Sequence, residues 1–173
     1  ATTYLAISEQ IDVLKAAAKQ FVGSVDVPAG TDLTCLVRNP YFNDETLGWH
    51  IARTGGDWNT VLNTYVVDSV CENGDVSLDK FYERWSDKVL VDSEISQTIA
   101  ALPAGHYRLE LDAIVASEES ETRGVTLSVG SRMEKLSISS EKPQHYEASI
   151  DIYGVPKDVR IALKIASSNA KWV

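Results

Sequence analysis

Apolar and polar residues alternate along Tyr107-Arg108-Leu109-Glu110-Leu111-Asp112-Ala113, and the apolar series continues to Val115. A period of two is typical of a β-strand with one face buried and the other in water. The same alternation recurs further along the chain, at Val125–Val129, Tyr146–Ile152 and Val159–Ile165. The sequence therefore predicts that antiparallel β-strands build the core of this protein.

Turn-forming residues separate these stretches and a further set of strand candidates upstream. The turn signals are Gly55-Gly56, Asn73-Gly74, Pro103-Ala104-Gly105, Gly130-Ser131 and Gly154-Val155-Pro156. The upstream strand candidates are Leu33–Val37, Trp49–Ala52, Trp58–Val67, Lys80–Trp85 and Ile95–Ile99. Many short strands divided in this way predict a mainly β fold, either a two-sheet antiparallel β-sandwich or a barrel.

The first segment of the chain has a different period. Its apolar residues fall at helical spacing, at Tyr4, Ile7, Ile11, Leu14, Ala18 and Phe21. We therefore expect an N-terminal amphipathic α-helix over residues 1–23, as the end of an adjoining helical segment of a longer protein. Residues 24–32 are interpreted as a linker, and residues 33–173 as the β-sandwich domain.

Composition and charge exclude several classes of protein. The 173 residues are 44% hydrophobic and 24% charged, which is ordinary for a globular domain. Sixteen Lys and Arg against 25 Asp and Glu give a net charge of −9. This charge would repel nucleic acid and anionic membranes, so neither is expected as a partner. The apolar runs are also too short for insertion into a membrane.

No motif for catalysis is present in the sequence. A nucleophile elbow, a P-loop, a HExxH helix and a dinucleotide fingerprint are all absent. The histidines His50, His106 and His145 lie far apart in the chain. The acidic stretches Asn43-Asp44-Glu45 and Glu118–Glu121 are interpreted as solvated turns rather than cation sites. We therefore expect a protein that is not an enzyme.

The two cysteines, Cys35 and Cys71, lack CxxC spacing and nearby histidines, which argues against a zinc site. Two unpaired thiols are the favoured interpretation, with a disulfide as the alternative. Cys35 alternates with Leu33 and Val37, and this pattern predicts a buried thiol on the face of a strand.

Aromatic residues are concentrated between residues 41 and 85, where the alternation is weakest. The C–H face of a sugar ring packs on a flat aromatic ring, and its hydroxyls need polar partners. Trp58 and Trp85 are the candidate stacking residues, and the candidate polar or flanking contacts are Tyr82, Arg84, Arg53 and Asn59. The alternative is that these aromatic residues fill the space between the sheets, as expected for Trp49.

Two parts of the sequence resemble a known superfamily. Leu36-Val37-Arg38-Asn39-Pro40-Tyr41-Phe42 followed by Gly48-Trp49 resembles the opening of galactose-binding-like jelly rolls. Glu83-Arg84-Trp85, Ile95–Ile99 and Leu102-Pro103-Ala104-Gly105-His106-Tyr107-Arg108-Leu109 resemble carbohydrate-binding-module-like sandwiches. The resemblance covers residues 33–173, and its most specific part, Leu-Pro-Ala-Gly-x-Tyr, belongs to the scaffold.

The resemblance implies a two-sheet jelly roll that binds a polysaccharide or glycan without catalysis. Such domains occur in multidomain secreted and surface proteins of bacteria, so an extracytoplasmic location and neighbouring domains are expected. No cofactor is implied, and a structural calcium ion has no assignable ligands. The closing strand of the family is expected to be missing or to lie beyond residue 173. The alternative function is a structural or protein–protein interaction module without sugar binding.

Overall fold

The computed structural model describes residues 13, 27–53, 64–139 and 142–173. Over these residues the protein is mainly β, which confirms the predicted fold class at that level. The strands are β1 (His50–Arg53), β2 (Thr64–Asn73), β3 (Val76–Arg84), β4 (Ser93–Leu102), β5 (Gly105–Ala113), β6 (Val125–Val129), β7 (Arg132–Lys135), β8 (Gln144–Ile152) and β9 (Lys157–Ile165). A short 3-10 turn, η1 (Thr34–Leu36), precedes β1.

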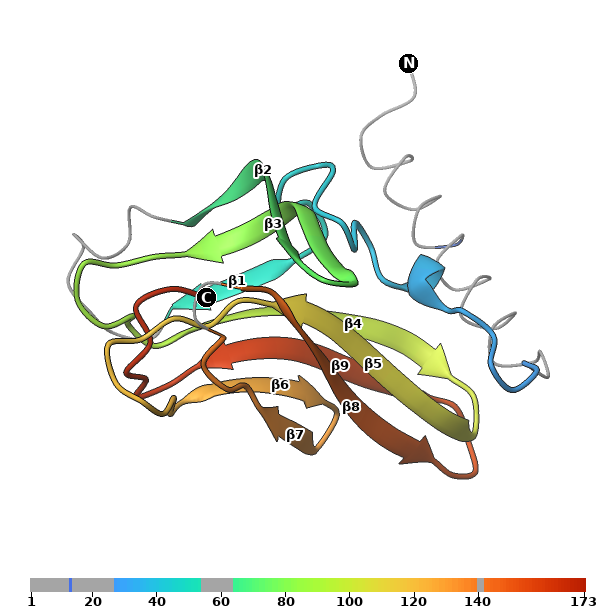
Figure 1. Cartoon of the computed structure of the whole chain (residues 1–173). Helices are drawn as coiled ribbons and strands as arrows, with labels where there is room; N and C mark the ends of the chain where they lie inside the picture. The colour runs from blue at the N-terminus through green and yellow to red at the C-terminus, as the bar shows by residue number, and fades with distance from the viewer. Residues whose placement is uncertain (1–12, 14–26, 54–63, 140–141) are drawn as a thin grey trace, which may run out of the picture.

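All strand pairings are antiparallel, as the alternating sequence predicts. One sheet has five strands in the order β1-β4-β9-β6-β7, and two further pairs are β2-β3 and β5-β8 (Figure 1). The core contains buried residues from β4, β5, β6, β8 and β9, among them Leu127, Ala148 and Ile161. The hydrophobic core therefore lies between the five-stranded sheet and the β5–β8 pair.

The predicted strand Leu33–Val37 is wrong, because this segment forms the 3-10 turn η1. The Thr34 amide donates to the Asp32 side chain at 2.8 Å, which starts a local turn. The Arg38 backbone then bonds to a side chain instead of a strand: its amide donates to Gln97 Oε1, and its carbonyl accepts from Gln97 Nε2. Cys35 is consequently exposed, not buried, and Cys35 and Cys71 are both free thiols.

A loop ordered by Asn39 leads from η1 to β1. The Asn39 side-chain amide donates to the carbonyl oxygens of Glu45 and Leu47, and the Trp49 indole donates to the Asn39 carbonyl. The Phe42 ring stacks on Trp49 at 5.6 Å. Trp49 is half-buried and packs against the core, where the sequence interpretation placed it.

Several expectations fall wholly or partly outside the described residues. These are the N-terminal helix over residues 1–23, of which Val13 alone is described, the start of the linker 24–32, and residues 58–63 of the strand candidate Trp58–Val67. Within the described part of the chain, no helix is long and apolar enough to cross a membrane.

The last residues of the chain lie between two distant segments. The backbones of Arg84 and Val173 exchange hydrogen bonds in both directions, at 2.7 and 2.9 Å. On the other side, the Ala116 amide donates to the Trp172 carbonyl, and the Lys171 amide donates to the Ala116 carbonyl. Residues 171–173 thus connect the end of β3 to the segment that follows β5 (Figure 1).

An ion pair across β4 and β9 predicts a pH-dependent contribution to stability. The guanidinium of Arg160 donates to the Glu94 carboxylate and to Ser96 Oγ. The bond from Arg160 lowers the pKa of Glu94, so this interaction stabilises the fold above the ordinary Glu pKa and is lost as the pH falls below it. We expect Glu94→Gln to lower the free energy of unfolding at pH 7 by about 0.5–1 kcal/mol, since Arg160 is half exposed.

Urea unfolding of Glu94→Gln and the parent protein at pH 7 and at acid pH measures this effect. The difference between the two proteins should shrink as the pH falls below 4.5, the ordinary Glu pKa. Glu119→Gln is the matched control, because Glu119 forms an exposed pair with Arg123 and should change little at any pH. A loss of stability from Glu94→Gln that is independent of pH would contradict the prediction.

Candidate functional site

Trp85 and Trp172 lie directly opposite each other where the C-terminal residues pair with the end of β3. Trp172 is also directly opposite Ala116. Directly opposed residues in an antiparallel pairing project their side chains to the same face, so both indoles lie on one side of this sheet. We call this pair the tryptophan surface.

The tryptophan surface faces away from the hydrophobic core. Val115 is fully buried in the core, and its neighbour Ala116 points to the opposite side of the extended chain. Trp172 shares the side of Ala116 and is half-buried, and Trp85 is 46% exposed. An indole exposed to this extent can present an aromatic face to a ligand.

Glu83 is the buried acidic residue next to this surface. Since alternate residues of a strand share a face, Glu83 projects to the same side as Trp85. Its side chain is 8% exposed, and Oε2 has no hydrogen-bond partner among the described residues. A buried carboxylate oxygen of this kind is uncommon in folded proteins, and it is enclosed by the protein rather than open to a ligand.

The other residues chosen from the sequence lie in different environments. Arg84 is 2% exposed, so its guanidinium is inside the protein and not on the surface. Burial lowers the pKa of Arg84, and its hydrogen bond with Tyr82 acts in the opposite direction. The half-buried Tyr82 ring stacks on Phe42 at 6.0 Å, and Arg53 is exposed at the end of β1. Trp58 and Asn59 lie outside the described residues.

Sequence reasoning did not select Trp172 as a site residue. The final residues have no alternation and are separated from Trp85 by most of the domain, so their partner could not be read from the pattern. The available signal was the indole itself, next to the polar residue Lys171.

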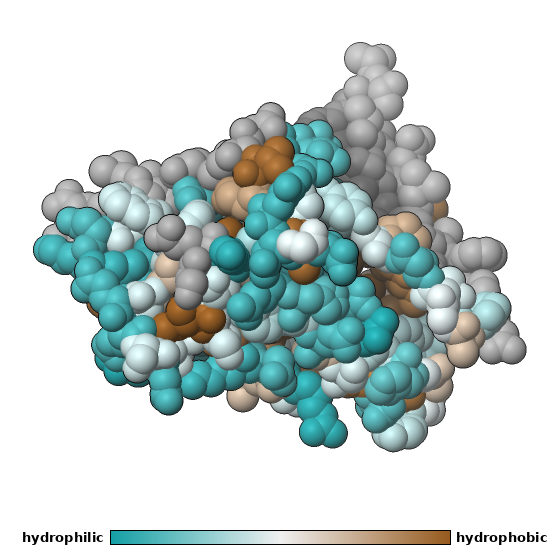
Figure 2. Space-filling view, in the orientation of Figure 1, coloured by the Kyte–Doolittle hydropathy of each residue, from teal (hydrophilic) through white to brown (hydrophobic). Residues whose placement is uncertain are grey.

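A second polar surface covers the outer side of the β5–β8 pair. Its members are the exposed alternate residues of both strands, His106, Arg108, Glu110, Asp112, His145, Glu147, Ser149 and Asp151. We call it the β5–β8 outer face. Hydrophilic side chains also cover much of the molecule in the space-filling view, with hydrophobic ones in separate small patches (Figure 2).

Ion pairs connect side chains along and across the two strands of the β5–β8 outer face. His106 Nδ1 lies 2.8 Å from Asp151, and His145 Nδ1 lies 2.7 Å from Asp112. The hydrogen bond with Asp112 raises the pKa of His145. Arg108 lies 2.6 Å from Glu110 and 3.3 Å from Glu147.

No protein-family model matches the chain, and no curated protein matches it. A solved structure described as "CBM4 structure and function" is similar at 15% identity and a TM-score of 0.45, covering 76% of this chain and 90% of that one. The enzymatically active domain of bacteriophage CBA120 tailspike protein 4 is similar at 13% identity and a TM-score of 0.48, over 88% of this chain and 21% of that one. Neither likeness identifies a ligand or a reaction for this chain.

Proposed function

We propose that this protein is a non-catalytic carbohydrate-binding module of the galactose-binding-like jelly-roll type, and that it acts outside the cytoplasm beside neighbouring domains. The observation that supports this function is the tryptophan surface, with Trp85 46% exposed and Trp172 beside it on the same face. Large aromatic side chains are usually buried, so a half-exposed Trp with a second Trp directly opposite it suits contact with a ligand.

The chemistry of the surface fits a sugar ring. The apolar C–H face of a pyranose stacks on an indole, and its hydroxyl groups need hydrogen-bond partners at the rim. In this proposal Trp85 and Trp172 stack on the glycan. Trp58 remains a further proposed stacking residue.

The test is retardation of the purified protein in native affinity gels that contain soluble polysaccharides and glycans. Trp85→Ala is expected to weaken binding about tenfold or more, as at other central aromatic contacts. Trp172→Ala should act in the same direction, with thermal unfolding used to confirm that each variant is folded. Tyr153→Ala is the matched control, because Tyr153 is a 75% exposed aromatic residue that directly follows β8 and is not part of the tryptophan surface.

The outcomes separate the two candidate functions. Binding that is lost in Trp85→Ala and kept in Tyr153→Ala supports the proposed site. Equal binding by all variants would contradict the site while leaving glycan binding in place. If no glycan retards the folded protein, the proposed function is wrong, and the alternative of a structural or protein-contact module is favoured.

A further inference from the structure

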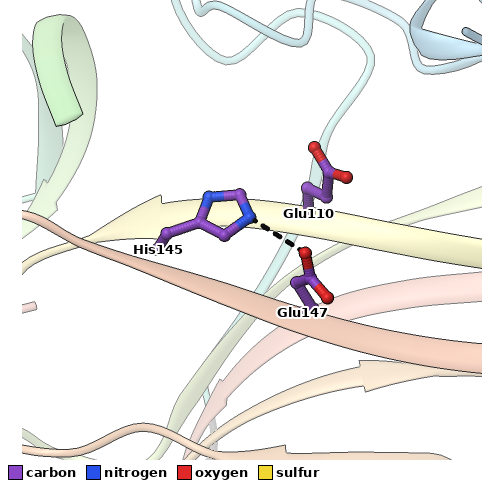
Figure 3. A group of neighbouring side chains, drawn as sticks. All are labelled: Glu110, His145 and Glu147. Carbon is purple, nitrogen blue, oxygen red and sulfur yellow. Dashed lines mark ion pairs between the residues drawn. The ribbon is translucent and has the colours of Figure 1, made fainter. Parts of the chain in front are cut away.

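A group of metal-ligand atoms lies on the β5–β8 outer face, apart from the tryptophan surface. Glu110, His145 and Glu147 each offer one ligand atom, and these atoms lie within 4.8 Å of one another. Figure 3 shows the three side chains next to one another, with the His145 ring directed toward Glu147. Among the described residues, it is the group of three or more His, Cys, Asp or Glu side chains whose ligand atoms come this close together.

The backbone holds the three residues in a fixed arrangement. Glu110 is directly opposite Glu147, and His145 lies two residues before Glu147 on the same face. The strands β5 and β8 pair without a bulge from Gly105 to Ala113. Only side-chain torsions therefore need to change for the three ligands to meet at one point, and ligands on paired strands are more precise than ligands on loops.

The imidazole is oriented by a carboxylate on its far side. Asp112 lies 2.7 Å from His145 Nδ1, which leaves Nε2 facing Glu147 Oε1 at 3.5 Å. A metal-bound histidine usually has its second nitrogen held by a carboxylate or carbonyl in this way. Ligand atoms around a tetrahedral zinc ion are separated by about 3.3 Å, given zinc–ligand bonds of about 2.0 Å. The separation between Nε2 and Glu147 is close to that value.

The charges of this group favour a cation and also limit its affinity. Two glutamates directly opposite each other repel, and a divalent ion between them would relieve that repulsion. Arg108 already lies against both carboxylates, at 2.6 Å from Glu110 and 3.3 Å from Glu147. An ion must share these carboxylates with Arg108, so binding should be reversible and not a requirement for folding.

We propose that Glu110, His145 and Glu147 form a binding site for a divalent transition-metal ion, with zinc as the representative ion. His145 Nε2 and one oxygen from each glutamate bind the metal, water completes the shell, and Asp112 positions the imidazole. An imidazole ligand favours zinc over calcium and magnesium, which prefer oxygen ligands alone. This proposal is independent of glycan binding at the tryptophan surface.

The experiment measures Zn²⁺ affinity of the whole chain by competition with a chromophoric chelator. His145→Gln should weaken binding about tenfold or more, and Asp112→Asn should weaken it about tenfold through loss of imidazole orientation. His106→Gln is the matched control, because His106 forms the equivalent pair with Asp151 on the same strands but lies beside Arg108 and Ser149. Its zinc affinity should equal that of the parent protein.

Further variants and ions keep the proposal falsifiable. Glu147→Gln removes a ligand with almost no change in shape and should also weaken Zn²⁺ binding. The thiols of Cys35 and Cys71 are present in every variant, so binding to them would leave His145→Gln unchanged. Equal affinity in His145→Gln and the parent protein, an equal loss in His106→Gln, Ca²⁺ binding as tight as Zn²⁺ binding, or no Zn²⁺ binding at all would each overturn the site.

Discussion

Gly124→Ala is expected to prevent folding or to lower the free energy of unfolding by about 3–5 kcal/mol, from left-handed strain and overpacking together. Gly124 has φ of +74° immediately before β6, a conformation that residues with a Cβ rarely adopt. A Cβ at this position would collide with the Ala166 carbonyl oxygen and come within 2.9 Å of backbone atoms of Ser168. These atoms cannot move away easily, because the Ala166 amide donates to the Gly124 carbonyl at 2.8 Å.

Gly154→Ala separates backbone strain from the collision. Gly154 has the same φ of +74°, but an added Cβ would meet no atom within 4 Å. The Gly154→Ala substitution should therefore lower the free energy of unfolding by about 1 kcal/mol, from the left-handed conformation alone. Urea unfolding of both variants measures the difference. Equal losses of unfolding free energy would show that the close approach of Gly124 to the segment after β9 adds nothing to the cost of the substitution.

Leu136→Ala is expected to lower the free energy of unfolding by about 3 kcal/mol, because removing a buried leucine side chain leaves a cavity in the core. Leu136 follows β7 and is fully buried. Its backbone is held in place: the amide donates to the Val125 carbonyl, and the carbonyl accepts from Thr122 Oγ1. The surrounding structure therefore has little freedom to close the cavity.

Met133→Ala is the control for Leu136→Ala, since Met133 lies on the neighbouring strand β7 and is 72% exposed. Its replacement should change stability by no more than about 0.5 kcal/mol. Thermal and urea unfolding of the two variants provide the comparison. A similar small effect at both positions would contradict the prediction, because it would mean that the Leu136 side chain contributes little to the packing of the core.

The strands with a regular pattern could be predicted from the sequence, and the others could not. Val125, Leu127 and Val129 alternate with polar residues and are the buried residues of β6. The next strand, β7, is exposed at every position at the edge of the sheet, so no apolar pattern marks it. The alternation in Leu33–Val37 was misleading. The side chains of Asp32 and Gln97 accept hydrogen bonds from the backbone amides of Thr34 and Arg38, which in a strand would pair with a neighbouring strand.

The candidate site depends on register, which a single sequence does not contain. Trp85 could be selected as an aromatic residue in a polar context, but its neighbour Trp172 comes from the other end of the domain. The sequence likewise marks Glu110 as a polar position on a strand, whereas only the pairing of β5 with β8 places it opposite Glu147. The sequence thus allowed the residue types of the site to be predicted, but not which of these residues lie next to each other in the fold.

The pairing of residues 171–173 with Arg84 and Ala116 has a consequence for the order of folding. Hairpins such as β2–β3 and β6–β7 close short loops and can form early, whereas contacts between distant residues carry a large loop-closure entropy. The contact between Trp85 and Trp172 is of the second kind. We therefore expect the tryptophan surface to be among the last features to assemble, because it forms only when residues 171–173 dock against the end of β3.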